Sequence, residues 1–262
     1  MSGGRLDYEV RGALARITLA QPERMNAMSF EMWSGLPEAV GRAVDDPAVR
    51  AIVVEGAGDR AFCAGADISQ FGARRTDPEA VAAYDKAVAD GMAALAGAAK
   101  PTIAVIRGIC FGGGFGLALA CDIRLARADA RFRVPAARLG LGYGLDGVSL
   151  ISRKLGPDAA ADILFSARIL DAAEALRLGV VAQVWDEEPF AAECEAYLDM
   201  VAGNAPLTLI AAKRALTELS RPEAERDPQA VARLVAACFA SADYREGQAA
   251  FKEKRPPVFT GS

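Results

Sequence analysis

The chain has 262 residues, enough for one large domain with or without an appendage. Apolar residues make up 52% and charged residues 24%, which favours a sizeable buried core and argues against disorder. The formal net charge is −4 and both signs are interspersed, so we expect neither a nucleic-acid partner nor a polybasic membrane patch. No apolar run approaches the length of a bilayer span, so we expect no membrane partner.

The sequence contains no histidine. This excludes Ser-His-Asp and Cys-His nucleophile systems and imidazole metal sites, so we expect no metal. Any acid or base must therefore be Asp, Glu, Tyr, Lys or Cys, with its pKa tuned by its surroundings. The five cysteines are scattered in apolar segments without a C-x-x-C pair, which predicts reduced, mostly buried thiols in a cytoplasmic protein.

The first half of the chain alternates between short apolar strands and helices. Two strands around Arg11-Gly12 predict a β-hairpin, and Ser29 is a plausible N-cap for the first helix. The strands are expected at residues 6–10, 13–19, 49–55, near 61–63 and at 102–107, and the helices at 29–44 and 78–98. This alternation predicts an α/β core with parallel strand pairing.

The second half becomes helical. Strands are expected at 123–126, near 132 and at 180–185, and helices near 158–166, 171–178, 187–202, 206–219, 228–241 and 243–253. The segment after about residue 190 has no predicted strand and is punctuated by prolines. We therefore predict a core over residues 1–190 and a helical region over 191–262, which either docks on another subunit or packs on its own domain.

A run of three glycines, Gly112 to Gly114, lies between a predicted buried strand and a predicted buried helix. Glycines at a helix start leave backbone N–H groups open to an anion or a developing oxyanion, although glycine there can also serve close helix packing. A second small-residue loop, Ala64-Gly65-Ala66, follows another strand. If both loops lie at the same edge of the sheet, the N–H groups of Ala66 and Gly113 can point at one oxygen.

Five stretches carry a family resemblance: MNAM at 25–28, AFCAGADI at 61–68, GICFGGG at 108–114, LACDIR at 119–124 and YREGQAAFKEKR at 244–255. In order and spacing, the chain closely resembles the enoyl-CoA hydratase/isomerase family of the crotonase superfamily. The resemblance implies an α/β, crotonase-like spiral of ββα units with a C-terminal helical trimerisation region. It also implies a homotrimer or a homohexamer.

The resemblance further implies an acyl-CoA thioester substrate, with coenzyme A as part of the substrate and no separate cofactor. The thioester oxygen would lie between the N–H groups of Ala66 and Gly113, an oxyanion hole that stabilises an enolate. The implied CoA or substrate contacts are Arg24, Ala27, Ala64, Asp67, Ile68 and Gly112. Asp67 belongs to a framework stretch of the family, so a structural role is expected of its side chain. Phe251 and Lys254 match positions that reach a neighbouring subunit's CoA, or they form a solvated helix end.

The chain departs from the family pattern at two positions. Hydratases of the family carry glutamates where this chain has Gly116 and Ala136. Because water addition needs a base and an acid, each worth about 10²–10⁴-fold, hydration by the usual mechanism is not expected. Asp146 is the candidate acid or base, or else it caps a helix beginning near Gly147. Tyr143 is a weaker catalytic candidate and fits better as a pocket wall.

These residues support three hypotheses. The first is an acyl-CoA lyase or isomerase that uses the oxyanion hole and one carboxylate, Asp146. The second is a decarboxylase of a malonyl-type thioester, because loss of CO₂ itself leaves an enolate and asks little of a protein base. The third is a non-catalytic acyl-CoA-binding member of the family.

Overall fold

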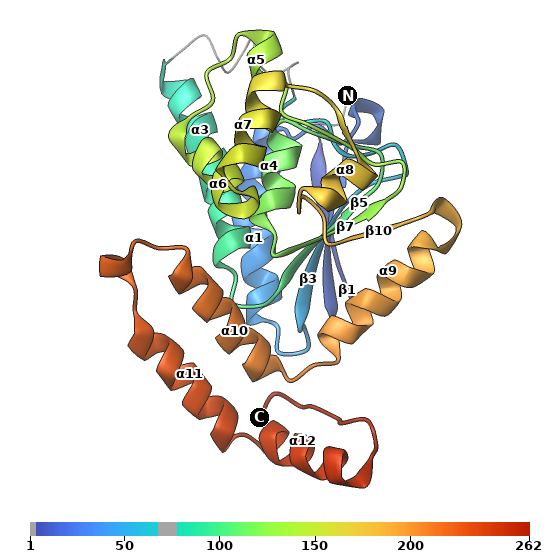
Figure 1. Cartoon of the computed structure of the whole chain (residues 1–262), viewed down its shortest axis with the longest axis vertical. Helices are drawn as coiled ribbons and strands as arrows, with labels where there is room; N and C mark the ends of the chain where they lie inside the picture. The colour runs from blue at the N-terminus through green and yellow to red at the C-terminus, as the bar shows by residue number, and fades with distance from the viewer. Residues whose placement is uncertain (1–3, 68–77) are drawn as a thin grey trace.

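The computed structural model describes residues 4–67 and 78–262. Its larger sheet has six strands in the order β1-β2-β3-β5-β7-β10 (Figure 1). β1 and β2 form the predicted antiparallel hairpin, and every other neighbouring pair in this sheet is parallel. The strands are β1 (Arg5–Arg11), β2 (Leu14–Ala20), β3 (Ala51–Gly56), β5 (Thr102–Ile106), β7 (Ile123–Arg127) and β10 (Gln183–Trp185).

A second sheet has four short strands in the order β4-β6-β8-β9. The first three run parallel and β9 pairs antiparallel with β8. These strands are β4 (Ala61–Cys63), β6 (Ile109–Phe111), β8 (Arg131–Arg133) and β9 (Leu170–Asp171). Each of the first three follows a strand of the larger sheet and precedes a helix, so the chain repeats a ββα unit and confirms the predicted spiral.

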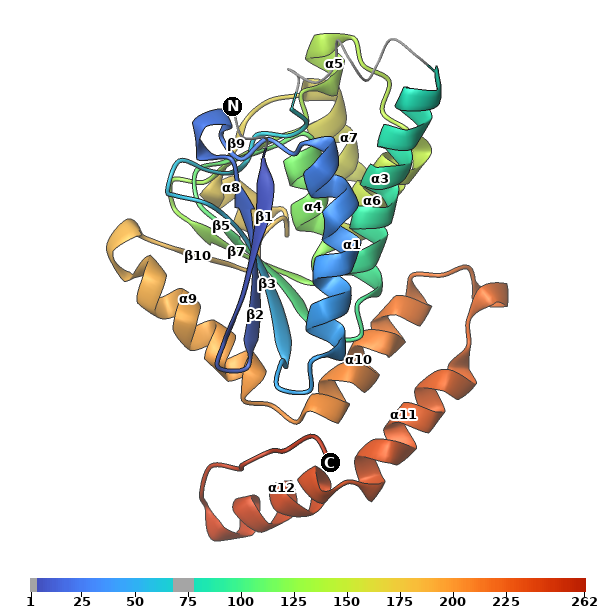
Figure 2. The same ribbon diagram turned by 180° about the vertical axis from the view of Figure 1, so that it is seen from behind.

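Helices cover one face of the larger sheet, where α1 (Phe30–Asp45), α3 (Pro78–Gly97) and α4 (Gly113–Ala120) lie side by side (Figure 2). Ser29 caps α1 as predicted, since its Oγ accepts the N–H of Met32 at 3.2 Å. The main apolar core lies between these helices and the sheet. It is closed by α5 (Ala136–Leu139), α6 (Leu145–Leu155), α7 (Pro157–Ser166) and α8 (Ala172–Arg177).

The other face of the larger sheet is covered by α9 (Glu187–Ala202), whose Phe190 and Leu198 pack against Val53 and Ile103. After α9 the chain continues into α10 (Pro206–Leu219), α11 (Pro228–Ala240) and α12 (Ala242–Glu253), which lie at the far end of the molecule (Figure 1). The helices expected in this region are confirmed. The division of the chain into a core over residues 1–190 and a helical region over 191–262 stays a prediction.

In the described part of the chain, no helix combines the length and the apolar character that crossing a bilayer requires.

Candidate active site

The first part of the site is the start of α4. β6 ends at Phe111, and Gly112 forms the N-cap with φ 52° and ψ −119° and without a side-chain cap. This left-handed backbone favours glycine, because a β-carbon there would be strained. The N–H of Gly112 donates to the carbonyl of Arg133 at 2.8 Å, so the turn is anchored to β8. Gly113 is then the first helical residue, and its N–H faces out of the helix.

The second part is the loop after β4. β4 and β6 are parallel neighbours, so the loops that follow them lie at the same edge of the small sheet. The N–H of Met28 donates to Gly65 O at 2.7 Å, and the N–H of Asp67 donates to Met28 O at 3.0 Å. In this parallel bridge the groups on either side of Ala66 are used, so the N–H of Ala66 itself points away from Met28.

The two loops bring Ala66 and Gly113 together. A β-carbon placed on Gly113 would lie 3.7 Å from Ala66 N, and one placed on Gly65 would lie 3.5 Å from Gly113 N. Gly65 has φ 111°, which lets the backbone approach this closely without a side chain. Within residues 4–67 and 78–262, neither the Ala66 nor the Gly113 N–H has a hydrogen-bond acceptor. Two neighbouring backbone N–H groups are therefore unpaired in the described part of the chain.

The loop at residues 21–28 is held rigidly beside these amides. Asn26 donates through Nδ2 to Ala61 O at 2.7 Å and accepts the N–H of Gln21 at 3.1 Å. The buried carboxylate of Asp67 accepts from Gln21 Nε2 at 3.0 Å and pairs with Arg24 at 2.9 Å. Asp67 thus ties this loop to the Ala66 segment, in line with the structural role expected of its side chain.

The remaining predicted contact residues divide into two groups. Ala27 is buried and Ala64 partly exposed beside the two amides, and the N–H of Ala64 donates to Met25 O at 2.9 Å. Ile68 lies outside the described residues. Phe251 and Lys254 are exposed on and just after α12, far from α4 in the same chain (Figure 1). One chain therefore does not bring these two residues to the Ala66 and Gly113 amides.

The two positions of the expected glutamates lie beside the Gly113 end of α4. A β-carbon on Gly116 would lie 2.9 Å from Met92 Cε on α3, so the methionine occupies the space into which a side chain at 116 would extend. Ala136 is buried at the start of α5 and follows Pro135, whose Cδ lies 3.8 Å from the β-carbon position of Gly112. Neither position offers a titratable group.

The predicted cap role of Asp146 is wrong. Helix α6 begins at Leu145, two residues earlier than expected, and Gly144 occupies the N-cap position without a side-chain cap. Asp146 is exposed in the first turn, where its charge is favourable to the helix dipole. α6 packs on α4, and Lys154 in its last turn donates to Cys121 O at 3.3 Å, just past the end of α4. The first turn, with Asp146, consequently lies towards the Gly113 end.

Tyr143 is half-buried against the main core and its ring lies over the start of α6. A β-carbon on Gly147 would lie 2.5 Å from Tyr143 Cε1, so glycine at 147 makes room for the ring. Burial raises the pKa of the Tyr143 hydroxyl above its usual value, which favours the protonated phenol. This placement fits the wall role that the sequence favours.

Burial of the cysteines near the site argues against a nucleophilic role for them. Cys63 and Cys110 are fully buried, and burial raises the pKa of Cys63 to about 12 and that of Cys110 well above the ordinary thiol value. Both thiols therefore stay protonated at neutral pH. Within the described ranges, no group of three or more Cys, Asp or Glu side chains gathers in a way that can hold a metal ion.

Two residues beside the site, Met92 and Trp33, carry no signal of this position in the sequence. Met92 lies within a long helix whose pattern only indicates burial. Trp33 lies on α1, and its Cζ2 is 3.6 Å from the β-carbon position of Gly113. Both look like ordinary core residues in the sequence, since apolar side chains at helical spacing carry no sign of which loop they contact.

The comparisons identify the family. The model of the enoyl-CoA hydratase/isomerase family matches residues 9–262, so the chain belongs to this family. This confirms the prediction of an acyl-CoA-processing enzyme that resembles enoyl-CoA hydratase/isomerase.

Crotonyl-CoA hydratase from Syntrophomonas wolfei is 33% identical to this chain over 248 residues, which cover 94% of each protein. Carnitinyl-CoA dehydratase from Proteus mirabilis is 34% identical over 260 residues, which cover 98% of each. The crystal structure of an enoyl-CoA hydratase/carnithine racemase from Magnetospirillum magneticum matches with a TM-score of 0.93 at 35% identity, covering 98% of this chain and 96% of that one.

Proposed function

We propose that the N–H groups of Ala66 and Gly113 bind the thioester oxygen of an acyl-CoA and stabilise the enolate form of its acyl group. The observation that carries this proposal is the pair of adjacent backbone donors without an acceptor in the described chain. Donors held in place before the reaction stabilise developing charge without reorganisation, and loss of one such donor costs about 10²–10³-fold in rate. The reaction is an isomerisation or a lyase reaction, with Asp146 as the candidate acid or base.

Efficient hydration through two carboxylates does not fit these residues. Met92 fills the space beside Gly116, and Ala136 carries only a methyl group. A general acid and a general base each contribute about 10²–10⁴-fold, so a chain without either would add water slowly. The relatives named as hydratases and dehydratases support the CoA-ester chemistry, whereas these two positions set this chain apart from the expected pattern.

A matched pair of variants tests the oxyanion hole. Gly113→Pro removes the N–H, and proline is tolerated at the first position of a helix. Gly113→Ala adds a β-carbon at ordinary contact distance from its neighbours but keeps the N–H. We expect exchange of the thioester α-hydrogens with deuterium to fall about 10²–10³-fold further in the proline variant than in the alanine variant. Equal rates in the two variants would contradict the proposal.

Decarboxylation of a malonyl-type thioester is the second candidate. Met92, and no carboxylate, occupies the space beside Gly116. This favours decarboxylation, because loss of CO₂ produces the enolate without a protein base. Release of CO₂ from malonyl-CoA and methylmalonyl-CoA tests it, and no release from either rejects it. Tight binding of CoA esters without α-hydrogen exchange or turnover would instead identify a non-catalytic acyl-CoA-binding member.

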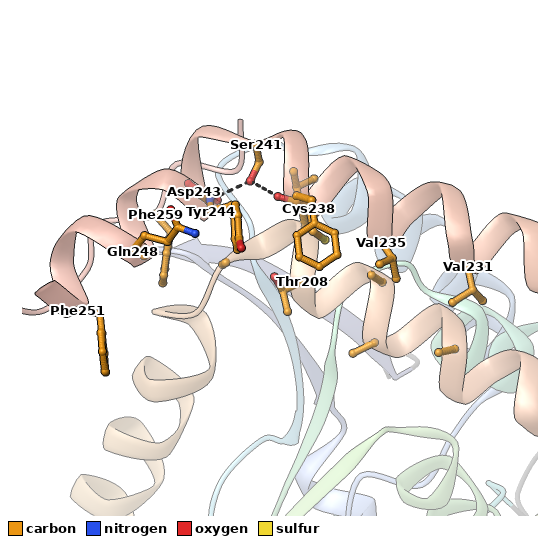
Figure 3. Close-up of a pocket in the computed structure, with 17 residues that line it drawn as sticks. Thr208, Val231, Val235, Cys238, Ser241, Asp243, Tyr244, Gln248, Phe251 and Phe259 are labelled. Atoms are coloured by element: carbon orange, nitrogen blue, oxygen red, sulfur yellow. Dashed lines mark hydrogen bonds between the residues drawn. The ribbon is translucent and has the colours of Figure 1, made fainter.

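We further propose that the C-terminal helices assemble the chain into a homotrimer or a homohexamer. An apolar groove of about 720 Å³ lies between α10, α11 and α12 (Figure 3). Val231 and Val235 of α11 line it. Phe239 of the same helix also lines it and is 61% exposed in the single chain. Covering such a surface with another copy removes apolar area from water.

Light scattering on the purified protein measures the assembly. We expect a trimer or hexamer for the wild type and a smaller species for Phe239→Asp. Phe165→Asp is the control, because Phe165 is 81% exposed on α7 and lies outside the groove. A monomeric wild type would contradict the assembly.

In such an assembly Phe251 and Lys254 would contact the CoA of a neighbouring subunit. Arg24, Ala27, Ala64, Asp67 and Gly112 would line the CoA path of their own subunit, with coenzyme A as part of the substrate and no separate cofactor. We also propose a cytoplasmic location, since the cysteines are free and four of the five are buried.

A further inference from the structure

Trp33 carries a buried polar group that the oxyanion hole does not use. Its side chain is 1% exposed, on the face of α1 that packs against α3. Its Nε1 is buried and has no hydrogen-bond partner among residues 4–67 and 78–262. Indole nitrogen is a donor only, and a buried donor without an acceptor is costly, so native proteins seldom leave one.

The edge of the indole that carries the N–H lies beside Gly113, one of the two residues of the proposed hole. Cζ2 of Trp33 lies 3.6 Å from the β-carbon position of Gly113, whereas Cε3 lies 3.1 Å from the β-carbon position of Gly91 on α3. These two carbons are opposite each other across the six-membered ring. Nε1 is bonded to the same ring atom as Cζ2, so the N–H belongs to the edge near Gly113 and not to the edge near α3.

The Trp33 edge lies close to the two amides that are proposed to bind the thioester oxygen. The β-carbon position of Gly113 lies 3.6 Å from Cζ2 of Trp33 and 3.7 Å from Ala66 N, so the Trp33 edge and the second amide are both close to Gly113. An acceptor for Nε1 lies about 3 Å from it. A thioester with its oxygen on the two amides would have its acyl group in the neighbourhood of this edge.

The surroundings select a neutral acceptor. Trp33 belongs to the main apolar core with Met32, Leu36 and Phe115. A carboxylate buried here without a counter-charge would be strongly disfavoured, whereas a hydroxyl or carbonyl oxygen needs only the hydrogen bond.

We propose that Trp33 is a specificity-determining residue whose Nε1–H donates to a hydroxyl or carbonyl oxygen on the acyl chain of the thioester. The preferred substrate is thus an acyl-CoA that bears a neutral oxygen on one of the first carbons after the thioester. This inference rests on the proposed oxyanion hole. Recognition by a buried donor also discriminates against the corresponding alkyl ester, because the donor stays unpaired when that ester binds.

Matched ligands test the proposal in the wild-type protein. We expect 3-hydroxybutyryl-CoA or 4-hydroxybutyryl-CoA to bind about three- to tenfold more tightly than butyryl-CoA, as one neutral hydrogen bond predicts. Equal affinity for all three esters overturns the role of Trp33 but leaves the proposed function intact. Absence of binding to every CoA ester rejects the proposed function itself, so the two failures are distinguishable.

Two variants locate the effect. Trp33→Phe removes the donor and keeps an aromatic ring, so it should bind all three esters equally, whereas Trp185→Phe on β10 should keep the preference of the wild type. In the Trp185→Phe protein Trp33 is the only tryptophan, since the sequence has two. We expect its N–H Raman band to move to lower frequency with a hydroxyacyl ester and to stay unchanged with butyryl-CoA. An unchanged band with every ester overturns the proposal even if Trp33→Phe does not fold.

Discussion

The two ends of α4 are built in opposite ways. At the first end Gly112 caps the helix without a side chain, and the N–H of Gly113 has no acceptor in the described chain. At the other end Cys121 O accepts from Arg124 at 2.9 Å and from Lys154 at 3.3 Å. Lys213 of α10 adds a buried cation near the same end, where it pairs with Asp122 at 2.8 Å.

At the carboxyl end of α4 a backbone carbonyl is paired with cationic side chains, whereas at the amino end a backbone N–H is left unpaired in the described part of the chain. Cations at the carboxyl end of a helix compensate its partial negative charge and its unpaired carbonyls. The amino end has the same need of anionic or carbonyl partners, yet glycines leave it open. A helix with one closed end is held in position, so its open end can present donors at a fixed place to a ligand.

The largest expected effect comes from removing a cation at the carboxyl end of α4. Lys213→Met removes a buried cation from its pair with Asp122. Asp122 is partly exposed and keeps its hydrogen bonds from Thr102, so we expect a loss of about 3 kcal/mol in the free energy of unfolding, the lower end for a broken buried pair, measured in urea. Catalytic turnover of the folded fraction should change little, because the substitution lies at the end of α4 away from Gly113. Lys252→Met, at an exposed position of α12, is the control and should have no comparable effect.

A substitution of Asp146, in the first turn of α6, tests the amino end of α4. Asp146→Asn should reduce turnover at least a hundredfold, about 2.7 kcal/mol, while CoA esters still bind, because a general acid or base contributes about 10²–10⁴-fold. Asp158→Asn is the matched control, since Asp158 is an exposed carboxylate in the first turn of α7. If both variants keep the wild-type rate, Asp146 is not the acid or base.

The smallest expected effect on stability comes from the cap itself. Gly112→Ala forces a β-carbon into a left-handed backbone, at a cost of about 1–3 kcal/mol, and shifts the Gly113 N–H. We expect the rate of α-hydrogen exchange to fall along with stability. Gly140→Ala also introduces a side chain at positive φ, 66°, but in open space away from Gly113, so it should lose stability without losing exchange. Equal exchange rates would show that the cap does not position the donor.

The fold was largely predictable from the sequence because its elements are strongly patterned. The β1–β2 hairpin, the Ser29 cap and the helices after residue 190 all follow from local signals. β6 was not predicted, since three residues between two glycines give too short a pattern. β6 gains its stability from pairing with β4 and β8, which are distant in the sequence.

The site was predictable where glycine marks it. The loops of Ala66 and Gly113 are visible because small residues are required where backbones approach closely. Met92, Trp33 and the closed end of α4 were not predictable, because long side chains from other helices supply them. The predicted role of Asp146 as a cap is wrong because α6 begins at Leu145, two residues before the expected start.

The bridge between Met28 and Ala66 also has a consequence for how the protein folds. The paired amides exist only after the loop near the amino end, the segment after β4 and the start of α4 have met. These contacts join parts of the chain that emerge from the ribosome far apart in time, and such long-range closure is slow. Ligand binding should thus return late in refolding, after most of the helical signal, and its recovery would report when the amino-terminal loop docks.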